Sequence, residues 1–557
     1  MQKQHSTSVR PTQIWPENYK RGAVQHNRTR RHDYVSAITS SFGGKFVPLS
    51  IVPLLREDGV LNSTLSINLQ MAETADMLLN PVRVSAMAYL VPKLALDRFK
   101  DMGTIDRSYA SEPEIDGSVV PWFETAVASD DIHEIHRTLG LHVPGGQTYN
   151  TDYVESFNAV WNYIALQRSS SLEKRDRLAS SLPPAFWEHT QMRHVVPTFD
   201  AAMVEGNIPI TFVSGSDELD IFRRSNAQAW KVMTAGTDNE QGNGELTSAS
   251  SVGQLRVPAA GGTTDSSLDP MGGLYAKLAA EGVQISLANI EQARETRAWS
   301  ELRAQYQGIS EDWMIDQLLA GIRLNDEVLK QPILLDHADT VVGMSERYAT
   351  DGDNLAKSVA DGRTSLSLKL RAPALQTGGC VVICGQVLPE MIYERQRDYY
   401  FRAETVDELP NRTADELDPQ PVETIKNGEV DESHAMQDDL FGYAPLNHRW
   451  MRRAPKVGGK YFRSNPTDPW DENRNRIWST EVENPTLGPD FYLSSTLSHE
   501  VFADSNTDPF EWWVTGDVGI EGLTYFGATL REALGDYEAI EAQVPTERLK
   551  GDGTDEG

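Results

Sequence analysis

Residues 81–92 read PVRVSAMAYLVP, and this stretch decides the fold class. Side chains of a β-strand point alternately to its two faces, so every second residue shares a face. One face of this stretch is apolar throughout, whereas the other mixes Arg83 and Ser85 with larger apolar side chains. The apolar face consists of Val82, Val84, Ala86, Ala88 and Leu90. We therefore predict a strand that is covered in part on both sides, as in a sandwich or a barrel.

The same character extends along the chain on either side of this strand. Upstream, residues 36–55 read SAITSSFGGKFVPLSIVPLL and residues 63–71 read STLSINLQM. Downstream, strand-like sequence returns at 365–375 and at 380–394. Apolar and β-branched residues fill these runs, and Gly, Pro and Asn separate them, which is typical of strands joined by turns. The sequence therefore predicts a mainly β fold with one antiparallel core.

Residues 93–205 depart from the strand pattern and are predicted to form a helical insertion. Within residues 149–182, apolar residues recur at spacings of three and four, which is the pattern of an amphipathic helix. They are Val154, Phe157, Val160, Trp161 and Ile164. Strand character returns at 206–215, and two further helices are predicted over 290–306 and 310–324.

Two segments follow the pattern of neither element. Residues 214–273 are rich in Gly, Ser, Thr and Asn, so they bury too little apolar surface to become ordered on their own. We predict a surface-exposed loop there, and a linker between domains is the alternative. Residues 404–439 are acidic and contain prolines and asparagines, which predicts a charged loop. No internal repeat of fixed period occurs, which argues against solenoids and propellers.

The chain length bounds the number of domains. At 557 residues it exceeds the size at which one hydrophobic core usually stops growing. An apolar content of 39% and a charged content of 24% are those of ordinary globular proteins. One core with large excursions fits the strand pattern better than several domains. No stretch approaches the roughly 20 apolar residues of a membrane span, and the start has no apolar signal segment, so we expect synthesis and retention in a cytosol.

Cys380 and Cys384 are the only cysteines of the chain. They lie in an apolar run where strand alternation would point both side chains to the same face. Residues four apart on one strand are too distant to form a disulfide without distortion. We therefore predict two buried free thiols.

The charge is distributed unevenly along the chain. The formal net charge is −30, which by itself argues against a nucleic-acid partner. Residues 1–32, however, carry seven cations against the single carboxylate Glu17, a balance of 7 − 1 = +6. The cations are Lys3, Arg10, Lys20, Arg21, Arg28, Arg30 and Arg31. We predict a basic N-terminal arm over residues 1–34 that contacts nucleic acid, and a solvated tail without a partner is the alternative.

A second basic cluster lies at residues 449–463, in the sequence RWMRRAPKVGGKYFR. Its cations alternate with Trp450, Tyr461 and Phe462, and cations for phosphates beside aromatic faces for bases are typical of single-strand binding. The candidate contacts are Arg449, Arg452, Arg453, Lys456 and Lys460. Structural pairs between these cations and carboxylates are the alternative.

Catalytic and metal-binding patterns are weak in this sequence. The histidines of DDIHEIHRTLGLH, at 133, 136 and 142, lack the spacing of a zinc-protease motif. Asp336, His337 and Asp339 could form an acid–base group, but no Gly-x-Ser-x-Gly nucleophile motif accompanies them. No phosphate-binding glycine loop and no calcium loop occurs. We therefore predict no catalytic residue, no cofactor and no metal.

The order of these segments resembles the major capsid proteins of microviruses, small tailless phages with a circular single-stranded DNA genome, and in particular the gokushovirus-like branch. The resemblance covers most of residues 35–530, while the Arg-rich arm and the ending FEWWVTGDVGIEGLTYFG differ from that branch. The matching segments are FVPLSIVPLLREDGV, MLLNPVRVSAMAYLVPKL, YVESFNAVWNYIALQR, SSLPPAFW, LANIEQARETRAWSELRAQY, GQVLPEMIYERQRDYYF and DLFGYAPLNHRWMRRAPKVGGKYF.

The resemblance implies an eight-stranded antiparallel jelly roll of the viral capsid type, with long helical and irregular insertions between its strands. Residues 35–557 would form this single capsid domain. About sixty copies would close an icosahedral T=1 shell, with the insertions supplying most subunit contacts. The loop at 214–273 corresponds in position to the large surface insertion of that family, which is a candidate for contact with a host-surface receptor.

The resemblance also implies partners and a location. The partners are further copies of the chain, packaged single-stranded DNA, a small basic DNA-packaging protein and a minor pilot protein. The location is the virion, after synthesis in the cytoplasm of a bacterial host. Two other classes of protein stay open: a carbohydrate-active β-sandwich enzyme, and a β-rich attachment protein that works as a monomer or trimer.

Overall fold

The computed structural model describes residues 27–199, 330–348, 358–463 and 476–527, with gaps at 75, 115, 129–133, 189–191, 193, 418–421 and 481. Between residues 200 and 329 it describes only 221–223, 232–233, 240–241, 274–276, 298–299, 315 and 321. The chain divides into two compact units. One comprises Met1–Thr198 together with Tyr306–Gly557, and the other comprises Phe199–Gln305.

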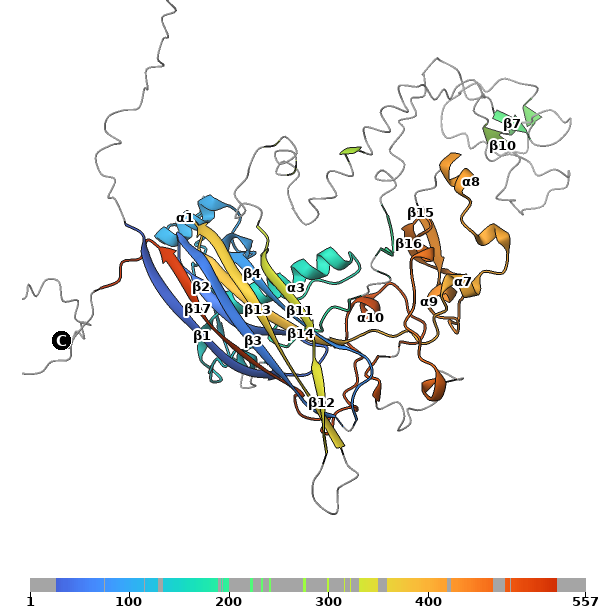
Figure 1. The fold of residues 1–557 in the computed structure, drawn as a ribbon. Helices are drawn as coiled ribbons and strands as arrows, with labels where there is room; N and C mark the ends of the chain where they lie inside the picture. The colour runs from blue at the N-terminus through green and yellow to red at the C-terminus, as the bar shows by residue number, and fades with distance from the viewer. Residues whose placement is uncertain are drawn as a thin grey trace, which may run out of the picture. The chain divides into compact units, whose positions relative to one another are not determined.

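The first unit is built on two antiparallel sheets (Figure 1). The five-stranded sheet has the order β1-β17-β3-β13-β12, and the four-stranded sheet has the order β11-β4-β14-β2. The strands of the first sheet are β1 (Thr29–Ser41), β17 (Phe510–Gly522), β3 (Asp58–Thr74), β13 (Ser358–Leu375) and β12 (Gly343–Tyr348). Those of the second are β11 (Ile333–Val341), β4 (Val82–Pro92), β14 (Gly379–Pro389) and β2 (Phe46–Leu54). The prediction of a mainly β, antiparallel fold is confirmed.

A hydrophobic core lies between the two sheets. The five-stranded sheet contributes Leu65, Ile67 and Trp512, and the four-stranded sheet contributes Leu49 and Val84, all fully buried. The apolar face predicted for residues 82–90 is confirmed, since all five of its residues belong to this core. Removal of this apolar surface from water is the main force that holds the sheets together.

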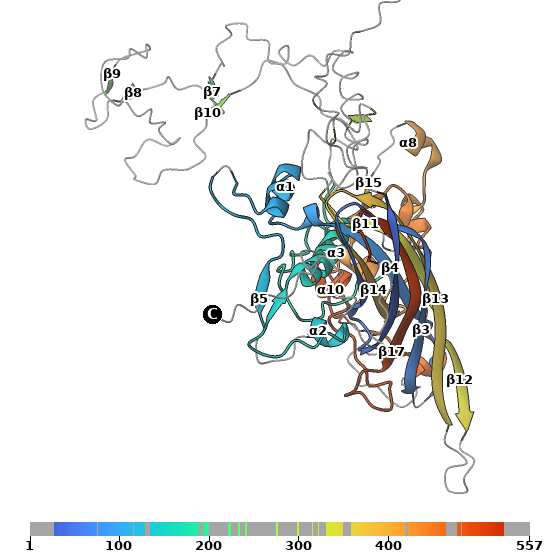
Figure 2. The same cartoon turned by 90° about the vertical axis from the view of Figure 1, so that its left-hand side faces the viewer.

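The opposite face of the four-stranded sheet is covered as well. Helix α3 (Asp152–Arg168) contacts β2, β4 and β14, and its Phe157 stacks on Phe46 of β2 with ring centroids 5.6 Å apart. Figure 2 shows α1, α2 and α3 on this side of the molecule. Tyr89 and Val91 of β4 belong to the resulting second core. The prediction of a strand covered on both sides is therefore confirmed. The helix predicted within residues 149–182 is confirmed for the first half of that range, because α3 ends at Arg168.

Residues 93–198 follow β4 of the four-stranded sheet and hold most of the helical structure among the described residues. The elements are η2 (Lys93–Ala95), α1 (Met102–Ala110), β5 (Thr125–Val127), α2 (Glu134–Thr138), β6 (Thr148–Asn150) and α3. Strands β5 and β6 pair with each other as a two-stranded sheet. The segment predicted to be a helical insertion is thus mixed, although its longest element is the expected helix.

A second insertion lies between β14 and β17. Its elements are α7 (Tyr399–Arg402), η4 (Val406–Glu408), α8 (Arg412–Leu417), β15 (Val422–Lys426), α9 (Asn427–Val430), β16 (Leu440–Pro445), η5 (His448–Trp450), η6 (Gly459–Tyr461) and α10 (Pro489–Tyr492). Residues 404–439, predicted as a charged loop, therefore include several short elements. The reason is that Ile425 and Val430 are fully buried against Phe441, which anchors an otherwise acidic segment.

The second unit contains four short strands among its described residues. They are β7 (Ile221–Arg223), β8 (Val232–Met233), β9 (Glu240–Gln241) and β10 (Leu274–Ala276). β7 pairs with β10, and β8 pairs with β9. The rest of the loop predicted at 214–273 and the strand predicted at 206–215 lie outside the described residues, as do nearly all residues of the helices predicted at 290–306 and 310–324. Among the described residues, no helix combines the length and apolar character needed to cross a membrane.

Candidate functional site

The described part of the N-terminal arm is tied to the five-stranded sheet. Lys3, Arg10, Lys20 and Arg21 lie outside the described residues. Arg30 and Arg31 belong to β1, so the predicted arm of residues 1–34 runs into the sheet from residue 29 onward. Strand β1 pairs with β17 along its whole length, from Thr29 opposite Gly522 to Ser41 opposite Phe510.

The three described arginines of this segment differ in their surroundings. Arg31 reaches the fully buried carboxylate of Asp58 at 2.7 Å. Arg30 is 67% exposed and lies 3.3 Å from Glu521, and Arg28 lies 3.6 Å from Glu57. Arg31 therefore neutralises a buried charge, whereas Arg28 and Arg30 form exposed pairs that are weak in water.

The second basic cluster divides into buried and exposed cations. Arg449 lies 3.0 Å from Glu423 and 4.5 Å from the centroid of the Tyr399 ring. Arg452 is buried and lies 3.4 Å from Glu429, which is itself buried. These two guanidinium groups are occupied by carboxylates, because a buried cation requires a paired anion. For Arg449 and Arg452 the structure therefore matches the alternative of structural pairs.

The remaining cations of this cluster face water. Arg453 and Lys460 are exposed, and the Lys460 amine lies 5.0 Å from the centroid of the Tyr461 ring. Lys456 is half exposed and lies 3.2 Å from Asp398. The side chain of Phe462 is also exposed, at 65%. Exposed cations and an exposed aromatic ring are therefore found from Arg453 onward in the predicted cluster.

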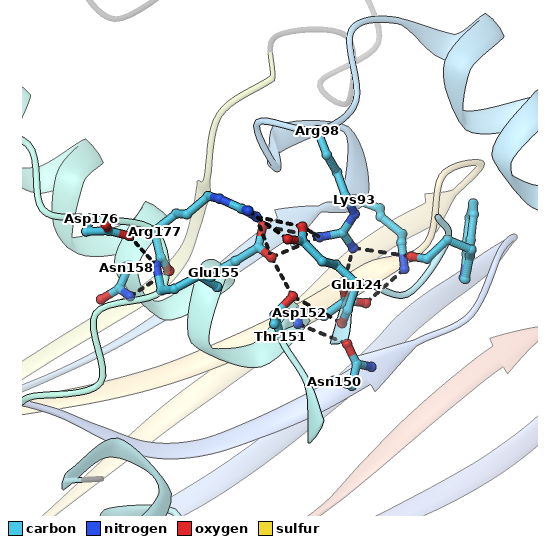
Figure 3. A network of polar contacts seen from close by, with 12 residues as sticks. Lys93, Arg98, Glu124, Asn150, Thr151, Asp152, Glu155, Asn158, Asp176 and Arg177 are labelled. Atoms are coloured by element: carbon cyan, nitrogen blue, oxygen red, sulfur yellow. Dashed lines mark hydrogen bonds and ion pairs between the residues drawn. The ribbon is translucent and has the colours of Figure 1, made fainter. Parts of the chain in front are cut away.

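A partly buried ionic network lies within the helical insertion, between the residues that follow β4 and helix α3 (Figure 3). Three cations meet three carboxylates, so the group is formally neutral. Lys93 lies 2.8 Å from Asp152, and Arg177 lies 2.7 Å from Glu124. The members are Lys93, Arg98, Arg177, Glu124, Asp152 and Glu155.

Arg98 is the centre of this network. It is 8% exposed, contacts Asp152, and lies 3.0 Å from Glu155. Both carboxylates lie in the first turn of α3, where the partial positive charge of the helix N-terminus also favours them. Sequence reasoning missed this network, because Arg98 and its partners are separated by more than fifty residues of an insertion.

Burial and charge shift the pKa values of the network. Burial lowers the pKa of Lys93, whose amine also lies 4.3 Å and 4.2 Å from the ring centroids of Trp122 and Phe123. The hydrogen bonds from Arg177 lower the pKa of Glu124. Because the charges are paired and sum to zero, the network is suited to hold two packed segments of the insertion together and not to bind a charged ligand.

A cavity of about 930 Å³ lies beside this network. Trp122, Phe123 and Lys93 line it together with residues of β1 and β2. Hydrolysis of a glycosidic bond needs two carboxylates that face each other across such a space. Three carboxylates line this cavity: Asp33, Glu57 and Asp152. Asp152 and Glu57 are held by cations, so no observation here favours the carbohydrate-active alternative.

Two of the other candidate chemical groups, His136 and Asp336, make contacts that hold elements of the fold. The ring of His136 is buried edge-on against Tyr149, with centroids 4.7 Å apart. Asp336 accepts a hydrogen bond from the backbone N–H of Lys369 at 2.6 Å, which links β11 to β13. His133 lies outside the described residues. Within the described ranges, no group of three or more His, Cys, Asp or Glu side chains could hold a metal ion.

The cysteine prediction is confirmed. Cys380 and Cys384 are free and buried, and both belong to the core between the four-stranded sheet and α3. Burial raises the pKa of the Cys380 thiol to about 12 and raises the pKa of the Cys384 thiol as well. Thiols in such surroundings are inert, because the reactive species is the thiolate.

Comparison with known proteins adds no relative to this description. No protein-family model matches the chain, and no curated protein matches its sequence.

Proposed function

We propose that this chain is the major capsid protein of a small virus with a single-stranded DNA genome. The observation that carries the proposal is the strand order of the two sheets. In chain order, β1, β3, β13 and β17 belong to one sheet, and β2, β4, β11 and β14 belong to the other. Each sheet thus interleaves early and late strands, as two Greek keys folded into an eight-stranded jelly roll would do, and this architecture is common in viral capsid domains. Strand β12 then extends β13 as a hairpin at the sheet edge.

The insertions support a role in assembly. Large apolar side chains are exposed on both of them, although the neighbouring cores are well packed. Such side chains favour association when they gather at a subunit interface. On the first insertion they include Val119, Phe123 and Val127, and on the second they include Tyr400, Phe401, Val406, Met451 and Phe462.

In the proposed particle, about sixty copies close a shell through these insertions, so that many weak contacts add up. The acidic chain, at −30, limits aggregation of finished particles. Packaged DNA, a small basic packaging protein and a minor pilot protein are the proposed internal partners. Surface loops, including residues 214–273, are proposed to meet a host receptor.

The experiment is purification of the full chain from expressing cells, followed by negative-stain microscopy and nuclease treatment. The proposal predicts closed particles of uniform diameter that protect single-stranded DNA from nuclease. A monomer or trimer that binds cells would instead support an attachment protein. Turnover of a glycan that is lost with one carboxylate pair would support an enzyme. Either of these results, without particles, overturns the proposal.

A further inference from the structure

One broad surface of the first unit is uncovered by its described elements. This is the outer face of the five-stranded sheet, on the side away from the core. Figure 1 looks onto this face, with α1 and α3 behind it, and Figure 2 shows the helices on the far side of the four-stranded sheet. An open antiparallel sheet face of this kind is a ready platform for a ligand that lies flat across several strands.

The centre of this face carries no formal charge. Two rows of side chains cross β1, β17, β3 and β13 in register. One row is Ile38, Trp513, Asn68 and Ser365, and the next is Ser36, Thr515, Ser66 and Ser367. Hydroxyl and amide groups of this kind donate and accept hydrogen bonds, so they suit a polar ligand of no particular sequence.

Cations of β13 flank this neutral band, with one before its two rows and two after them. Arg363, Lys369 and Arg371 alternate with buried residues of β13, so they project from the same outer face, and all three are exposed. None has a carboxylate within ion-pair distance among the described residues. Strand β17, two strands away from β13, carries three carboxylates: Asp517 lies 2.8 Å from His32 and Glu521 lies 3.3 Å from Arg30, whereas the exposed Glu511 has no ion pair among the described residues. The unpaired charge on this face is therefore positive along β13 and negative at Glu511.

Two exposed aromatic rings lie on β17 and β1, one within the neutral band and the other in the row that follows it. Trp513 of β17 is 50% exposed and Tyr34 of β1 is 71% exposed. Two strand spacings, about 10 Å, separate β17 from β13. A nucleotide can cover such a span with its phosphate over β13 and its base over Trp513. Aromatic faces and cations in this arrangement are what single-strand binding surfaces share.

A hollow continues the cationic edge toward the N-terminal arm. It measures about 530 Å³ and lies at the end of β3 and β13, and its polar lining consists of Arg371, Asn62, Arg28 and Glu521, the last of which pairs with Arg30. Arg28 is the first described cation of the chain, so the basic arm joins the sheet at the end of the cationic row. The arm and the sheet face can therefore act on one continuous strand of nucleic acid.

We propose that the outer face of the five-stranded sheet binds single-stranded DNA without sequence preference, with phosphates on Arg363, Lys369 and Arg371 and bases on Trp513 and Tyr34. This inference rests on the proposed function, because it places the packaged genome on a defined surface. It adds residues that lie in neither basic cluster of the sequence.

The test measures binding of fluorescent oligothymidylate to the full chain at several salt concentrations. The triple variant Arg363→Ser, Lys369→Ser, Arg371→Ser removes three phosphate contacts, so the slope of log affinity against log salt should fall in magnitude by about 2. The control variant Arg137→Ser, Arg412→Ser, Lys426→Ser changes the net charge equally at exposed ion pairs elsewhere, and its slope should stay closer to that of the wild type. Equal slopes for the two triple variants overturn the inference.

A second pair of variants tests stacking. Trp513→Ser should weaken oligonucleotide binding several-fold while the salt slope stays unchanged, and Trp513→Phe should restore most of the affinity. Equal binding by all three proteins contradicts base stacking at this position.

Particles distinguish this inference from the proposed function. If the wild type forms no particles, the capsid proposal fails whatever the oligonucleotide data show. If the wild type forms particles with DNA, and the β13 triple variant packages the same amount of DNA per particle, only the sheet-face inference fails. A face that binds duplex DNA or another protein, and not oligothymidylate, also overturns it.

Discussion

At the scale of single residues, Arg98 shows how much one buried side chain can hold together. Its guanidinium contacts Asp152, Glu155 and the backbone carbonyl of Trp122. Glu155 is 2% exposed, so without Arg98 part of its charge would lack compensation in a site that water reaches poorly. A buried charge that loses its partner is far more costly than a pair that was never formed.

We expect Arg98→Met to lower the free energy of unfolding by about 3–5 kcal/mol, the usual cost of breaking a buried ion pair. The measurement is denaturant-induced unfolding followed by tryptophan fluorescence. Arg412→Met is the matched control, because Arg412 is 91% exposed and Glu416 is its ion-pair partner among the described residues. The control should change stability by less than about 0.5 kcal/mol. If Arg98→Met and Arg412→Met have similar stabilities, Arg177, which lies 3.1 Å from Glu155, is sufficient to neutralise that carboxylate.

Glu124 of the same network predicts a dependence on pH. The hydrogen bonds from Arg177 lower its pKa below the ordinary value of 4.5 in the folded protein. Its contribution to stability is therefore fully present above pH 4.5 and is lost as the pH falls through the lowered folded value. The melting temperature should fall between about pH 5 and pH 3, and Glu124→Gln should flatten this fall. Parallel melting curves for wild type and variant would assign the acid sensitivity to other carboxylates.

At the scale of elements, the turn into β14 depends on two glycines. Gly378 has φ +69° and Gly379 has φ +155°, which L side chains rarely adopt. A Cβ atom on Gly379 would lie 2.1 Å from the carbonyl oxygen of Val91 on the paired strand β4. The close approach of these two central strands therefore requires a residue without a side chain.

We expect Gly379→Ala to destabilise the fold by about 1–3 kcal/mol, through backbone strain and separation of β14 from β4. Thermal unfolding followed by circular dichroism measures the effect. Gly458→Ala is the control, because a Cβ atom there meets no other atom within 4 Å and its φ is negative. A melting temperature of Gly379→Ala equal to that of the control would show that the turn can relax at no cost.

At the scale of the whole molecule, the cations of residues 1–32 fall into two groups for which we propose different roles. Arg31 compensates Asp58 inside the fold, so its loss acts on stability. The cations that precede residue 27 are not required for this contact. Their proposed role is to attract the phosphates of packaged DNA, in line with the +6 balance of residues 1–32.

We expect the quadruple variant Lys3→Ser, Arg10→Ser, Lys20→Ser, Arg21→Ser to assemble particles that contain less DNA. The measurement is DNA content per purified particle, from absorbance and quantitative amplification. Arg31→Ser is the comparison: it should reduce the yield of folded protein and leave the DNA content of each assembled particle unchanged. Normal DNA content in the quadruple variant would show that these four cations are not needed for DNA packaging.

The sequence alone determined several features, because they depend on interactions between residues that are close in the chain. Alternation of side chains placed both faces of residues 82–91 correctly, and spacing of three and four identified the helix that carries Val154 and Trp161. The buried thiols followed from the same alternation. Each of these patterns depends only on residues a few positions apart.

Tertiary structure alone decided which distant groups meet. The sequence names no partner for Arg98, Arg449 or Arg452, and only the chain path brings them to Asp152, Glu423 and Glu429. The uncovered face likewise exists because β1 and β17 pair across more than 450 residues beside β3 and β13. Contacts at such separations depend on the whole topology, and no local period in the sequence encodes them.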